Sequence, residues 1–415
     1  MPDPLTPPDP LAGLRAAMAN ELSTGILPFW QEHAFDPNGR LVGVVDDDGT
    51  HHDEGPRSAV LVARLVWTFA AAAQALPDQA DSLLATGRQA LALLTGPLWD
   101  HEHGGVFWTV NGDGEVLEDR KQVYAQAFAI YAFAQWHLTT GEDDALHRAM
   151  ALFELLEKHT RDRGRGGYIE ARSRTWGTLD NMALSPKDLN VPKSMNTNLH
   201  VMEALETLVR AQASPRVAEA LGEVVRALTH RIVQQEPWPS CALFFDEEWH
   251  VVGDTISYGH DIEASWLLWQ SWETWTTVSG ADDPDLADAV LHAMTGLADA
   301  VLAHGVDRDG AVMYEGGPEG VRNAQKHWWP QAEGVIGWLN AFQVTSDVRY
   351  RDAALATWAF IEESVIDREN GEWFAELEQD RTPRVGTIGE VKIGPWKCPY
   401  HNARACIEVM ARVNV

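Results

Sequence analysis

Apolar residues recur at helical spacing along most of the chain. In each such segment they return every three or four residues, which gathers them on one face of a helix. The alternation that marks a strand is confined to short pieces such as residues 106–110. The pattern therefore predicts an all-α protein. The segments predicted as helices are residues 60–75, 122–139, 145–159, 196–211, 217–234, 262–278, 286–304, 332–345 and 349–365.

Glycines at the turns between these segments divide the chain into repeats. Gly39, Gly105, Gly167, Gly310 and Gly371 follow one another at intervals of about 60–70 residues, with one double gap after Gly167. A pair of helices with a turn fills such a period, and about six pairs fit in 415 residues. This predicts an (α/α)6 barrel. An open solenoid of stacked pairs is the alternative, and closure is favoured because a ring offers a concave end to a small ligand.

The organisation of the chain is expected to be simple. No low-complexity linker interrupts it, so we expect one (α/α)6-barrel catalytic domain over residues 1–415. The proline-rich residues 1–10 are predicted to be a loose tail.

The charge balance narrows the class of ligand. The chain has 61 Asp and Glu against 32 Lys and Arg, a formal net charge of −29. Such a surface repels phosphate backbones and anionic lipid, so no nucleic acid or membrane partner is expected, and a neutral small molecule is favoured. The first residues lack the regions of a signal peptide, and the three cysteines form no CxxC pair. We expect a cytoplasmic protein that is a monomer or a weak homodimer.

A row of polar residues follows the apolar face of one predicted helix. Asn196, His200 and Glu203 lie at i, i+4 and i+7, so they share a side of that helix. Polar groups in such a position must be hydrogen-bonded or functional. A histidine of this kind is more often structural, so the row alone is weak evidence.

A second histidine opens the tryptophan-rich helix that follows. His260 lies near the predicted N-terminus, with Glu263 one turn on. The helix dipole lowers the pKa of an imidazole in this position, and a neutral imidazole is a competent general base. The alternative is that Asp261 caps the helix and His260 has no chemical role.

Aromatic residues gather before two later helices. Trp328 and Trp329 precede Pro330 and predict a rigid aromatic wall, although core packing accounts equally well for one of them. In residues 394–404, two prolines fix a loop that presents Trp396 and His401.

An arginine also interrupts an apolar helix. Arg64 needs a partner there, and it could anchor an oxyanion or form a structural ion pair. Motifs for other chemistry are missing: the chain has no GxGxxG before a helix, no GxxxxGK[ST] and no GxSxG. His51-His52 and His101-Glu102-His103 have no further metal ligand at a known spacing.

Four of these motifs, in this order, resemble those of the N-acylglucosamine 2-epimerase superfamily. The last motif is similar to that of its cellobiose 2-epimerase branch, and the resemblance covers most of the chain. The family fold is an (α/α)6 barrel, as the repeats predict. The motifs are residues 196–200, 259–263, 328–333 and 396–402.

The resemblance implies a sugar 2-epimerase that interconverts reducing-end glucose and mannose. His260 and His401 would face each other across C2 of an opened aldose, one removing the C2 proton and the other returning a proton to the opposite face of a cis-enediolate. His200 would assist ring opening, and Arg64 would hold the O1/O2 oxyanion. No metal or cofactor is implied, because two bases suffice for proton transfer. The residues implied to bind the sugar are Tyr124, Asp188, Asn196, Glu263, Trp328, Trp329, Glu333 and Trp396.

Two positions depart from the pattern of the disaccharide-acting branch. That branch usually has His where this chain has Asn198, and Arg where this chain has Ala183. The loop of residues 176–193 lies where the second sugar would rest. Cellobiose-type β-1,4 disaccharides and free mannose or glucose are therefore both retained as substrates.

Other reactions stay open at this point. A mannose 2-epimerase acting mainly on the monosaccharide, or a mannose–fructose isomerase that reprotonates C1, would use the same two histidines. An (α/α)6 glycoside hydrolase would need two carboxylates, such as Glu263 and Glu333, and would leave the histidines without a role. A sugar-binding protein without activity would need aromatic planes but no opposed bases.

Overall fold

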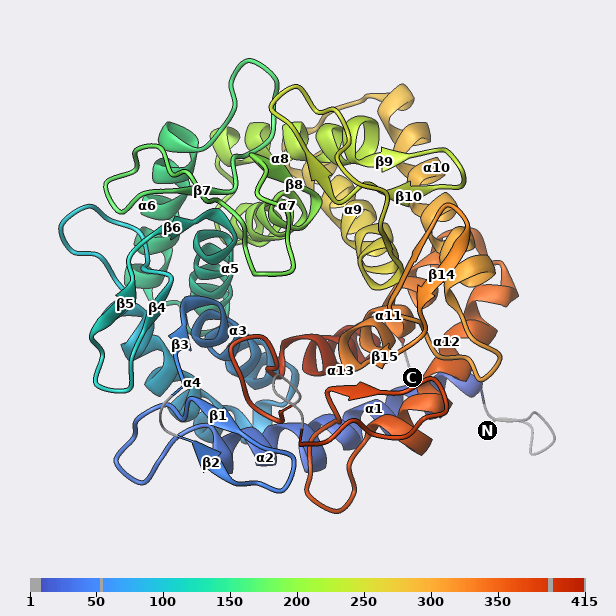
Figure 1. Ribbon diagram of the computed structural model, residues 1–415, viewed down its shortest axis with the longest axis horizontal. Helices are drawn as coiled ribbons and strands as arrows, with labels where there is room; N and C mark the ends of the chain where they lie inside the picture. Colours follow the sequence, from blue (N-terminus) through green and yellow to red (C-terminus); the bar gives the residue numbers. More distant parts are fainter. Residues whose placement is uncertain (1–8, 53–54, 387–390, 414–415) are drawn as a thin grey trace.

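Two concentric rings of helices make up the protein in the computed structural model, which describes residues 9–413 apart from 53–54 and 387–390 (Figure 1). Within the described residues six helices form the inner ring. Each contacts the next, and the last contacts the first, so the ring is closed. This confirms the predicted (α/α)6 barrel and excludes the open solenoid. The inner helices are α3 (Ala59–Ala75), α5 (Val123–Thr140), α7 (Met195–Ala211), α9 (Tyr258–Ser279), α11 (Trp328–Thr345) and α13 (Tyr400–Arg412).

The outer ring packs each of its helices on the inner ring, and several outer helices end in a π-helical turn. It consists of α1 (Pro10–Asn20) with η1 (Glu21–Ile26) and α2 (Leu27–His33), α4 (Ala80–Thr95) after η2 (Pro77–Gln79), α6 (Asp143–His159), α8 (Pro215–Ala227) with η3 (Leu228–Ile232), α10 (Pro284–Ala300) with η4 (Val301–Gly305), and α12 (Val348–Phe360) with η5 (Ile361–Val365).

The periodic pattern located five of the six inner helices and missed part of the outer ring. All nine predicted segments are helical, whereas the inner helix α13 and the outer helices α1, α2 and α4 were not predicted. On α4 the buried positions include Gly87, which lies against Trp136, so the apolar stripe is weak there. The predicted tail of residues 1–10 lies mostly outside the described residues, but its last part is helical. Asp9 accepts a hydrogen bond from the Leu11 amide and caps α1, which begins at Pro10.

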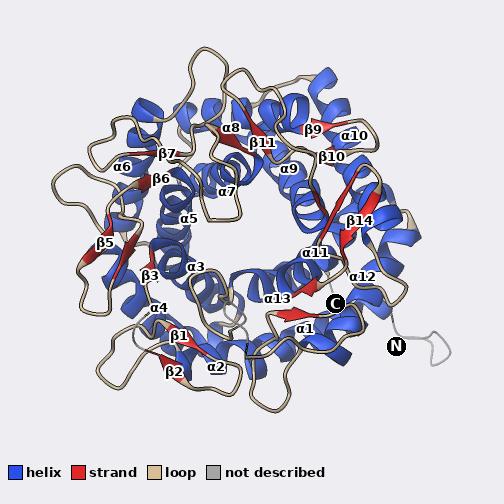
Figure 2. Ribbon diagram, viewed as in Figure 1, coloured by secondary structure: helices blue, strands red, loops and turns tan. Residues whose placement is uncertain are grey.

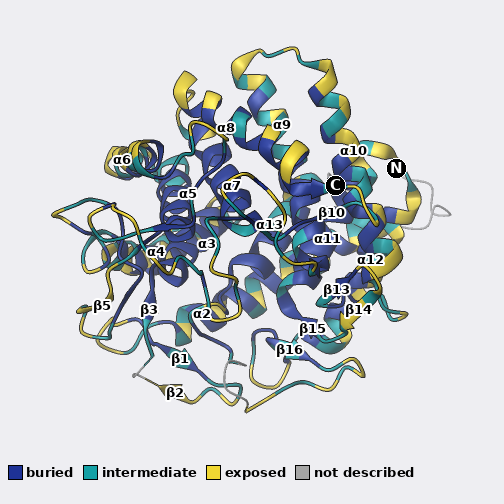
Figure 3. Ribbon diagram, turned by 45° about the horizontal axis from the view of Figure 1, so that its top comes forward, coloured by how far each residue is buried: buried dark blue, intermediate teal, exposed yellow. Residues whose placement is uncertain are grey.

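The inner helices are apolar on all sides because they face both the outer ring and the barrel interior. Every residue of α5 from Val123 to Trp136 is buried, and so is every residue of α3 from Ala59 to Ala73. Figure 3 shows this contrast between the buried inner helices and the outer helices, whose outward faces are exposed. By length and hydropathy alone, the outer segment Pro284–Gly305 could cross a membrane, and here it packs on α9 and α11.

Short antiparallel strand pairs connect neighbouring loops at the end of the barrel where the inner helices begin (Figure 2). The strand that leads into one inner helix pairs with a strand of the next outer-to-inner loop, and a bridge from Val45 to Ile393 joins the first loop to the last. The pairs are β3 (Arg57–Ser58) with β4 (Thr109–Val110), β6 (Lys121–Gln122) with β7 (Ala171–Arg172), β8 (Lys193–Ser194) with β11 (Phe244–Phe245), β12 (Ile256–Ser257) with β13 (Glu315–Gly317), and β15 (Lys326–His327) with β16 (Glu376–Leu377). The remaining strands extend these loops: β1 (Val44–Val45) with β2 (His51–His52), β9 (Val233–Gln234) with β10 (Ser240–Cys241), β5 (Val116–Glu118) on β4, and β14 (Gly320–Asn323) on β13.

The repeated glycines lie in the turns of these loops. All five predicted positions have positive φ, between 73° and 86°, which favours glycine. The double gap after Gly167 spans the repeat of α8, whose loop carries the β9–β10 hairpin instead. A buried lysine before the inner helix is bound to an aspartate of the turn in several repeats, which fixes the helix N-termini. Examples are Lys121–Asp100 at 2.9 Å and Lys193–Asp162 at 2.8 Å.

Candidate active site

The candidate residues come together because the inner helices are parallel and begin at one end of the barrel. Each predicted motif opens one of these helices, so residues from distant parts of the sequence lie in the first two turns of neighbouring helices. The residues so placed are Arg64 on α3, Tyr124 on α5, Asn196 and His200 on α7, His260 and Glu263 on α9, Trp328, Trp329 and Glu333 on α11, and His401 on α13. Asp188 and Trp396 lie on loops at the same end.

Two imidazoles contact the indole of Trp329. Its ring centroid lies 4.7 Å from that of His260 and 5.6 Å from that of His401. Nδ1 of His260 lies 2.8 Å from Ser257 Oγ, and Nδ1 of His401 lies 2.7 Å from Glu333 Oε1. In the described part of the chain, neither Nε2 has a protein partner. Each ring is therefore oriented through one nitrogen, and the other remains available to a ligand.

Burial keeps both imidazoles neutral. It lowers the pKa of His260 to about 3, with smaller contributions from the positive charges of His200 and Arg64. Burial also lowers the pKa of His401 well below its ordinary value, again with nearby cations acting in the same direction. Burial and neighbouring cations thus act on the pKa of His260 in the same direction as the helix dipole considered above. Asp261 does not act as the helix cap: its Oδ1 accepts a hydrogen bond from the Cys241 amide at 2.7 Å.

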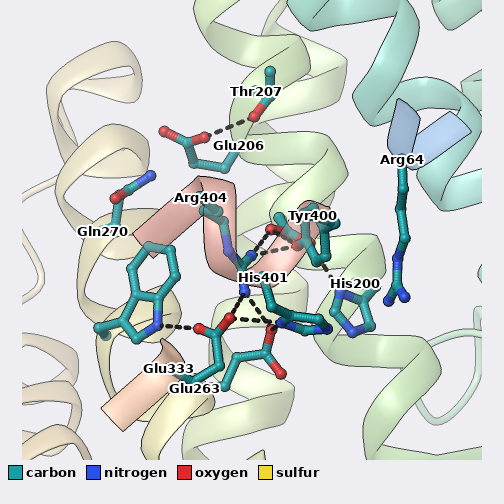
Figure 4. A network of polar contacts seen from close by, with 12 residues as sticks. Arg64, His200, Glu206, Thr207, Glu263, Gln270, Glu333, Tyr400, His401 and Arg404 are labelled. Atoms are coloured by element: carbon teal, nitrogen blue, oxygen red, sulfur yellow. Dashed lines mark hydrogen bonds and ion pairs between the residues drawn. The ribbon is translucent and has the colours of Figure 1, made fainter. Parts of the chain in front are cut away.

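Arg404, which the sequence analysis did not assign, joins three buried carboxylates beneath the imidazoles (Figure 4). Its Nη2 donates to Glu263 Oε1 at 2.5 Å and to Glu333 Oε1 at 2.7 Å. Its Nη1 contacts Glu203 Oε1 and Tyr400 Oη. The sequence carries one signal for Arg404: it is a charged residue one turn after His401, and the residues around it on α13 are buried.

The carboxylates of this network differ in charge. Burial acts to raise the pKa of Glu203, but the Arg404 guanidinium and the hydrogen bonds from His200 and Tyr400 outweigh it and lower that pKa to about 2. Burial, with the neighbouring Glu333, raises the pKa of Glu263 to about 7. Two members of the row predicted on α7 are bonded to each other, since His200 Nδ1 lies 2.8 Å from Glu203 Oε2. The pKa of Glu263 lies near neutral pH, whereas the pKa of Glu203 lies far below it.

One subset of the network has the composition of a metal site. Glu263, Glu333 and His401 offer ligand atoms that all lie within 4.8 Å of one another. Nη2 of Arg404 donates to both carboxylates and supplies positive charge at that position. The carboxylates are thus already compensated by a side chain of the protein.

Arg64 has no carboxylate partner within the described residues, so the structure decides against the predicted ion pair. Its Nη2 donates to Tyr124 Oη at 2.8 Å, and its Nη1 lies 3.7 Å from Cys398 Sγ. The guanidinium carbon lies 4.3 Å from the ring centroid of Phe128 and 4.7 Å from that of Tyr400. A buried cation held by aromatic faces and neutral groups keeps its charge for an anionic ligand.

The two adjacent tryptophans differ in their surroundings. Trp329 is half-buried and contacts both imidazoles. Trp328 is buried, and its ring lies 5.2 Å from the Lys397 ammonium on the loop that leads to His401. Trp328 therefore supports the loop, while Trp329 faces the candidate site.

A cleft of about 620 Å³ lies at the mouth of the barrel. Trp108 and Trp396 stand on one side, with ring centroids 6.0 Å apart, and the loop that contains Ala183 and Asp188 forms another. Trp396 is 38% exposed. A smaller hollow of about 40 Å³ leads inward and is lined by Asp188, Asn196 and His260, and Oδ1 of Asn196 is buried without a hydrogen-bond partner among the described residues.

Comparison with known proteins identifies the family. The N-acylglucosamine 2-epimerase (GlcNAc 2-epimerase) family matches residues 41–405. The chain belongs to this family. It is 36% identical over 401 residues to cellobiose 2-epimerase of Bacteroides fragilis, covering 96% of this chain and 98% of that protein. The solved structure of cellobiose 2-epimerase from Bacillus thermoamylovorans matches with a TM-score of 0.88 at 32% identity, covering 97% of this chain and 100% of that chain.

A protein named as an isomerase is also among the relatives. D-mannose isomerase of Marinomonas mediterranea is 25% identical over 405 residues, covering 92% of this chain and 94% of that protein. Together these findings confirm the predicted family, the barrel and the isomerase class of enzyme.

Proposed function

We propose that this epimerase-family protein inverts C2 of the reducing-end sugar of a cellobiose-type β-1,4 disaccharide, with His260 and His401 as the two bases. The observation that carries the proposal is the pair of imidazoles that both contact Trp329. Each ring is held at Nδ1 and directs a free Nε2 away from its holder. Two opposed bases are the arrangement that inversion at a carbon acid requires.

The proton transfers balance across the two histidines. One imidazole accepts the C2 proton through Nε2, and the electron pair of the broken C–H bond forms a cis-enediolate with the C1 carbonyl. After rotation about the C2–C3 bond, the other histidine donates a proton to the opposite face. The step balances with one extra proton on the pair: the histidine that reprotonates C2 enters the step as an imidazolium with a proton on Nε2, and the histidine that took the C2 proton leaves it as the imidazolium. Glu333 favours the other proton of His401 on Nδ1.

The remaining predicted residues serve the open-chain sugar and its anion. Arg64, which has no carboxylate partner among the described residues, holds the negative charge that develops on O1 and O2. His200 shuttles the proton of ring opening while Glu203 fixes its orientation. Asn196 and Asp188, which line the hollow beside His260, and Tyr124, which is bonded to Arg64, bind hydroxyl groups of the sugar.

The mouth of the barrel supports a disaccharide substrate. The cleft of about 620 Å³ lies outward from His260, where a second sugar ring attached at O4 would extend. Trp396 and Trp108 provide aromatic faces for that ring. Ala183 lines the cleft without a charged side chain, and its carbonyl accepts a hydrogen bond from Arg120 Nη1 at 3.0 Å, so a guanidinium is present on this wall from another loop.

Hydrolysis is disfavoured by the arrangement of the carboxylates. Glycoside hydrolases place two carboxyl groups on either side of the scissile bond. Here Oε1 of Glu263 and Oε1 of Glu333 converge on one nitrogen of Arg404, beneath the histidines. No bond can lie between two carboxylates that share a guanidinium.

Incubation in D2O tests the reaction. Cellobiose and mannose are supplied separately with a chelator, and the products are separated by chromatography. A 2-epimer with deuterium at C2 supports the proposal, and faster turnover of cellobiose supports the second-sugar cleft. Fructose as the main product from mannose would instead assign the chain to the isomerase reaction. This alternative is retained because a D-mannose isomerase is among the relatives. No reaction with either sugar contradicts the proposal.

Histidine variants test the roles of the residues. His260→Ala and His401→Ala are each expected to abolish turnover while cellobiose binding stays nearly intact, because the sugar is held mainly by other groups. His137→Ala, at the far end of α5, is the matched control and should keep full activity. Substantial turnover by either of the first two variants would sink the two-base assignment.

Several properties stay predictions from composition. We expect the protein to act in the cytoplasm as a monomer or a weak homodimer, on sugar alone and without nucleic acid or membrane partners. Size-exclusion chromatography with light scattering measures the oligomeric state directly.

A further inference from the structure

A second cavity lies at the opposite end of the barrel, where the inner helices end. Its volume is about 350 Å³, within the range of small-molecule sites. Residues of α3, α5, α7, α9 and α13 line it, together with Arg15 of α1. Its lining includes the exposed residues Gln74, Arg210 and Ala411.

The Arg404 network separates this cavity from the candidate active site. In Figure 4, Glu206 and Gln270 lie on the other side of Arg404 from His401. Glu203 lines the cavity and also binds Arg404 and His200. The two spaces therefore share a wall one side chain thick, and none of the residues assigned to proton transfer lines the second one.

The lining combines aromatic planes with neutral polar groups. Trp67 and Tyr131 are stacked, with centroids 5.1 Å apart at 14°. Gln135 and Gln270 present amides, with Gln135 bonded only to neutral groups. Ser271 Oγ and Trp67 Nε1 are buried and have no hydrogen-bond partner among the described residues. These groups can bond a ligand that enters the cavity.

The charges around the cavity are paired within the described residues except for Arg15, whose Nε donates to the Met410 carbonyl, and the lining also holds three carboxylates, so positive charge is not in excess. Glu203 binds Arg404, and Glu206 lies 3.7 Å from Arg210. Glu408 lies 2.8 Å from Arg412. An anionic ligand would find no excess positive charge, and a cation would compete with arginines in place. The lining favours an uncharged ligand that offers several hydroxyl groups to amides and an apolar face to indole rings.

We propose that this cavity is a second, non-catalytic binding site for a neutral polyhydroxylated ligand, a polyol or a free monosaccharide. The proposal stands whether or not the proposed epimerisation is correct, because no residue of the proton transfer is used. The ligand reaches the site from the end where the inner helices terminate.

Crystals of the wild-type protein soaked in glucitol test the site directly, because this hexitol has no carbonyl group and cannot be turned over. We expect density for a hexitol between Gln135 and Gln270, separate from any molecule near His260. A parallel soak in mannose distinguishes a polyol from a sugar as occupant, and inorganic phosphate should leave the cavity empty of ligand. Water alone in the cavity at saturating glucitol and mannose would overturn the proposal.

Calorimetric titration with glucitol supplies the solution test. Gln270→Leu should weaken the second-site affinity roughly tenfold, since one good hydrogen bond is lost. Ala71→Phe fills the cavity and should remove the site, while Gln89→Leu on the outer face of α4 should change nothing. Two results would reduce the finding to binding at crystal concentration only. One is an equal affinity for glucitol in the wild type and in both cavity variants; the other is density in the crystals with no second site detected in solution. If the wild-type protein binds the hexitol at this site but turns over neither cellobiose nor mannose, that result would count against the proposed reaction alone.

Discussion

Removal of the Arg404 guanidinium should destabilise the protein in a pH-dependent way. In Arg404→Met, the carboxylates of Glu203, Glu263 and Glu333 lose their common partner inside the barrel. Leaving one partner of a buried ion pair uncompensated typically costs about 3–5 kcal/mol. For Glu203 alone, lowering the pKa from 4.5 to about 2 corresponds to about 3 kcal/mol of stability. We therefore expect a loss of about 3–5 kcal/mol at pH 8.

The sign of the pH dependence follows from the direction of each pKa. In the wild type, the contribution of Glu203 is complete above pH 4.5 and is lost only as the pH falls towards 2. In Arg404→Met, burial dominates and raises the pKa of the carboxyls above their ordinary values. A group of that kind stabilises fully below its unfolded pKa and loses the contribution as the pH rises through its folded value. The variant should therefore lose less stability at pH 5 than at pH 8.

Urea unfolding at pH 5 and pH 8 measures both effects. Arg165→Met is the matched control, because Arg165 pairs with Glu248 at the surface and should change stability by less than about 1 kcal/mol. A loss below about 1 kcal/mol for Arg404→Met at pH 8, or a larger loss at pH 5, would refute the reasoning.

Three further variants probe the site. Trp396→Ala should raise KM for cellobiose strongly and leave kcat nearly unchanged, because a stacking plane at the mouth is lost; an unchanged KM would assign Trp396 to packing. Arg64→Met should lower kcat roughly 100-fold or more with a smaller change in sugar binding, because the guanidinium acts on the charge of the enediolate; steady-state kinetics with an undiminished kcat would contradict this. Gly259→Ala places a Cβ 2.5 Å from Trp329 Cη2 and 2.8 Å from Pro330 Cγ, so it should displace the indole and lower kcat/KM, whereas Gly13→Ala, which meets nothing within 4 Å, should leave both constants unchanged.

Hydrophobic periodicity identified five of the six inner helices because they bury apolar residues on every side, and it missed α13, whose buried positions include His401, Asn402 and Arg404. The outer helices α1, α2 and α4 were missed because their buried stripes are narrow, and because prolines at the start of α1 were interpreted as a tail. The positive φ of the turn glycines is a local property, so the period of Gly39, Gly105 and Gly167 was visible in the sequence.

The sequence by itself determined the helical barrel, the family and the residues that open the inner helices. Each of these depends on residues close together in the sequence. Apolar residues every three or four positions indicate a helix, a glycine marks a turn, and short motifs contain His260 and His401. Only the tertiary structure decided the connections across the barrel. Arg404 binds Glu203, Glu263 and Glu333, which come from three other helices, and Arg64 meets Tyr124 instead of a carboxylate. Partners so far apart in the chain leave no local pattern, because the parallel packing of the inner helices alone brings them together.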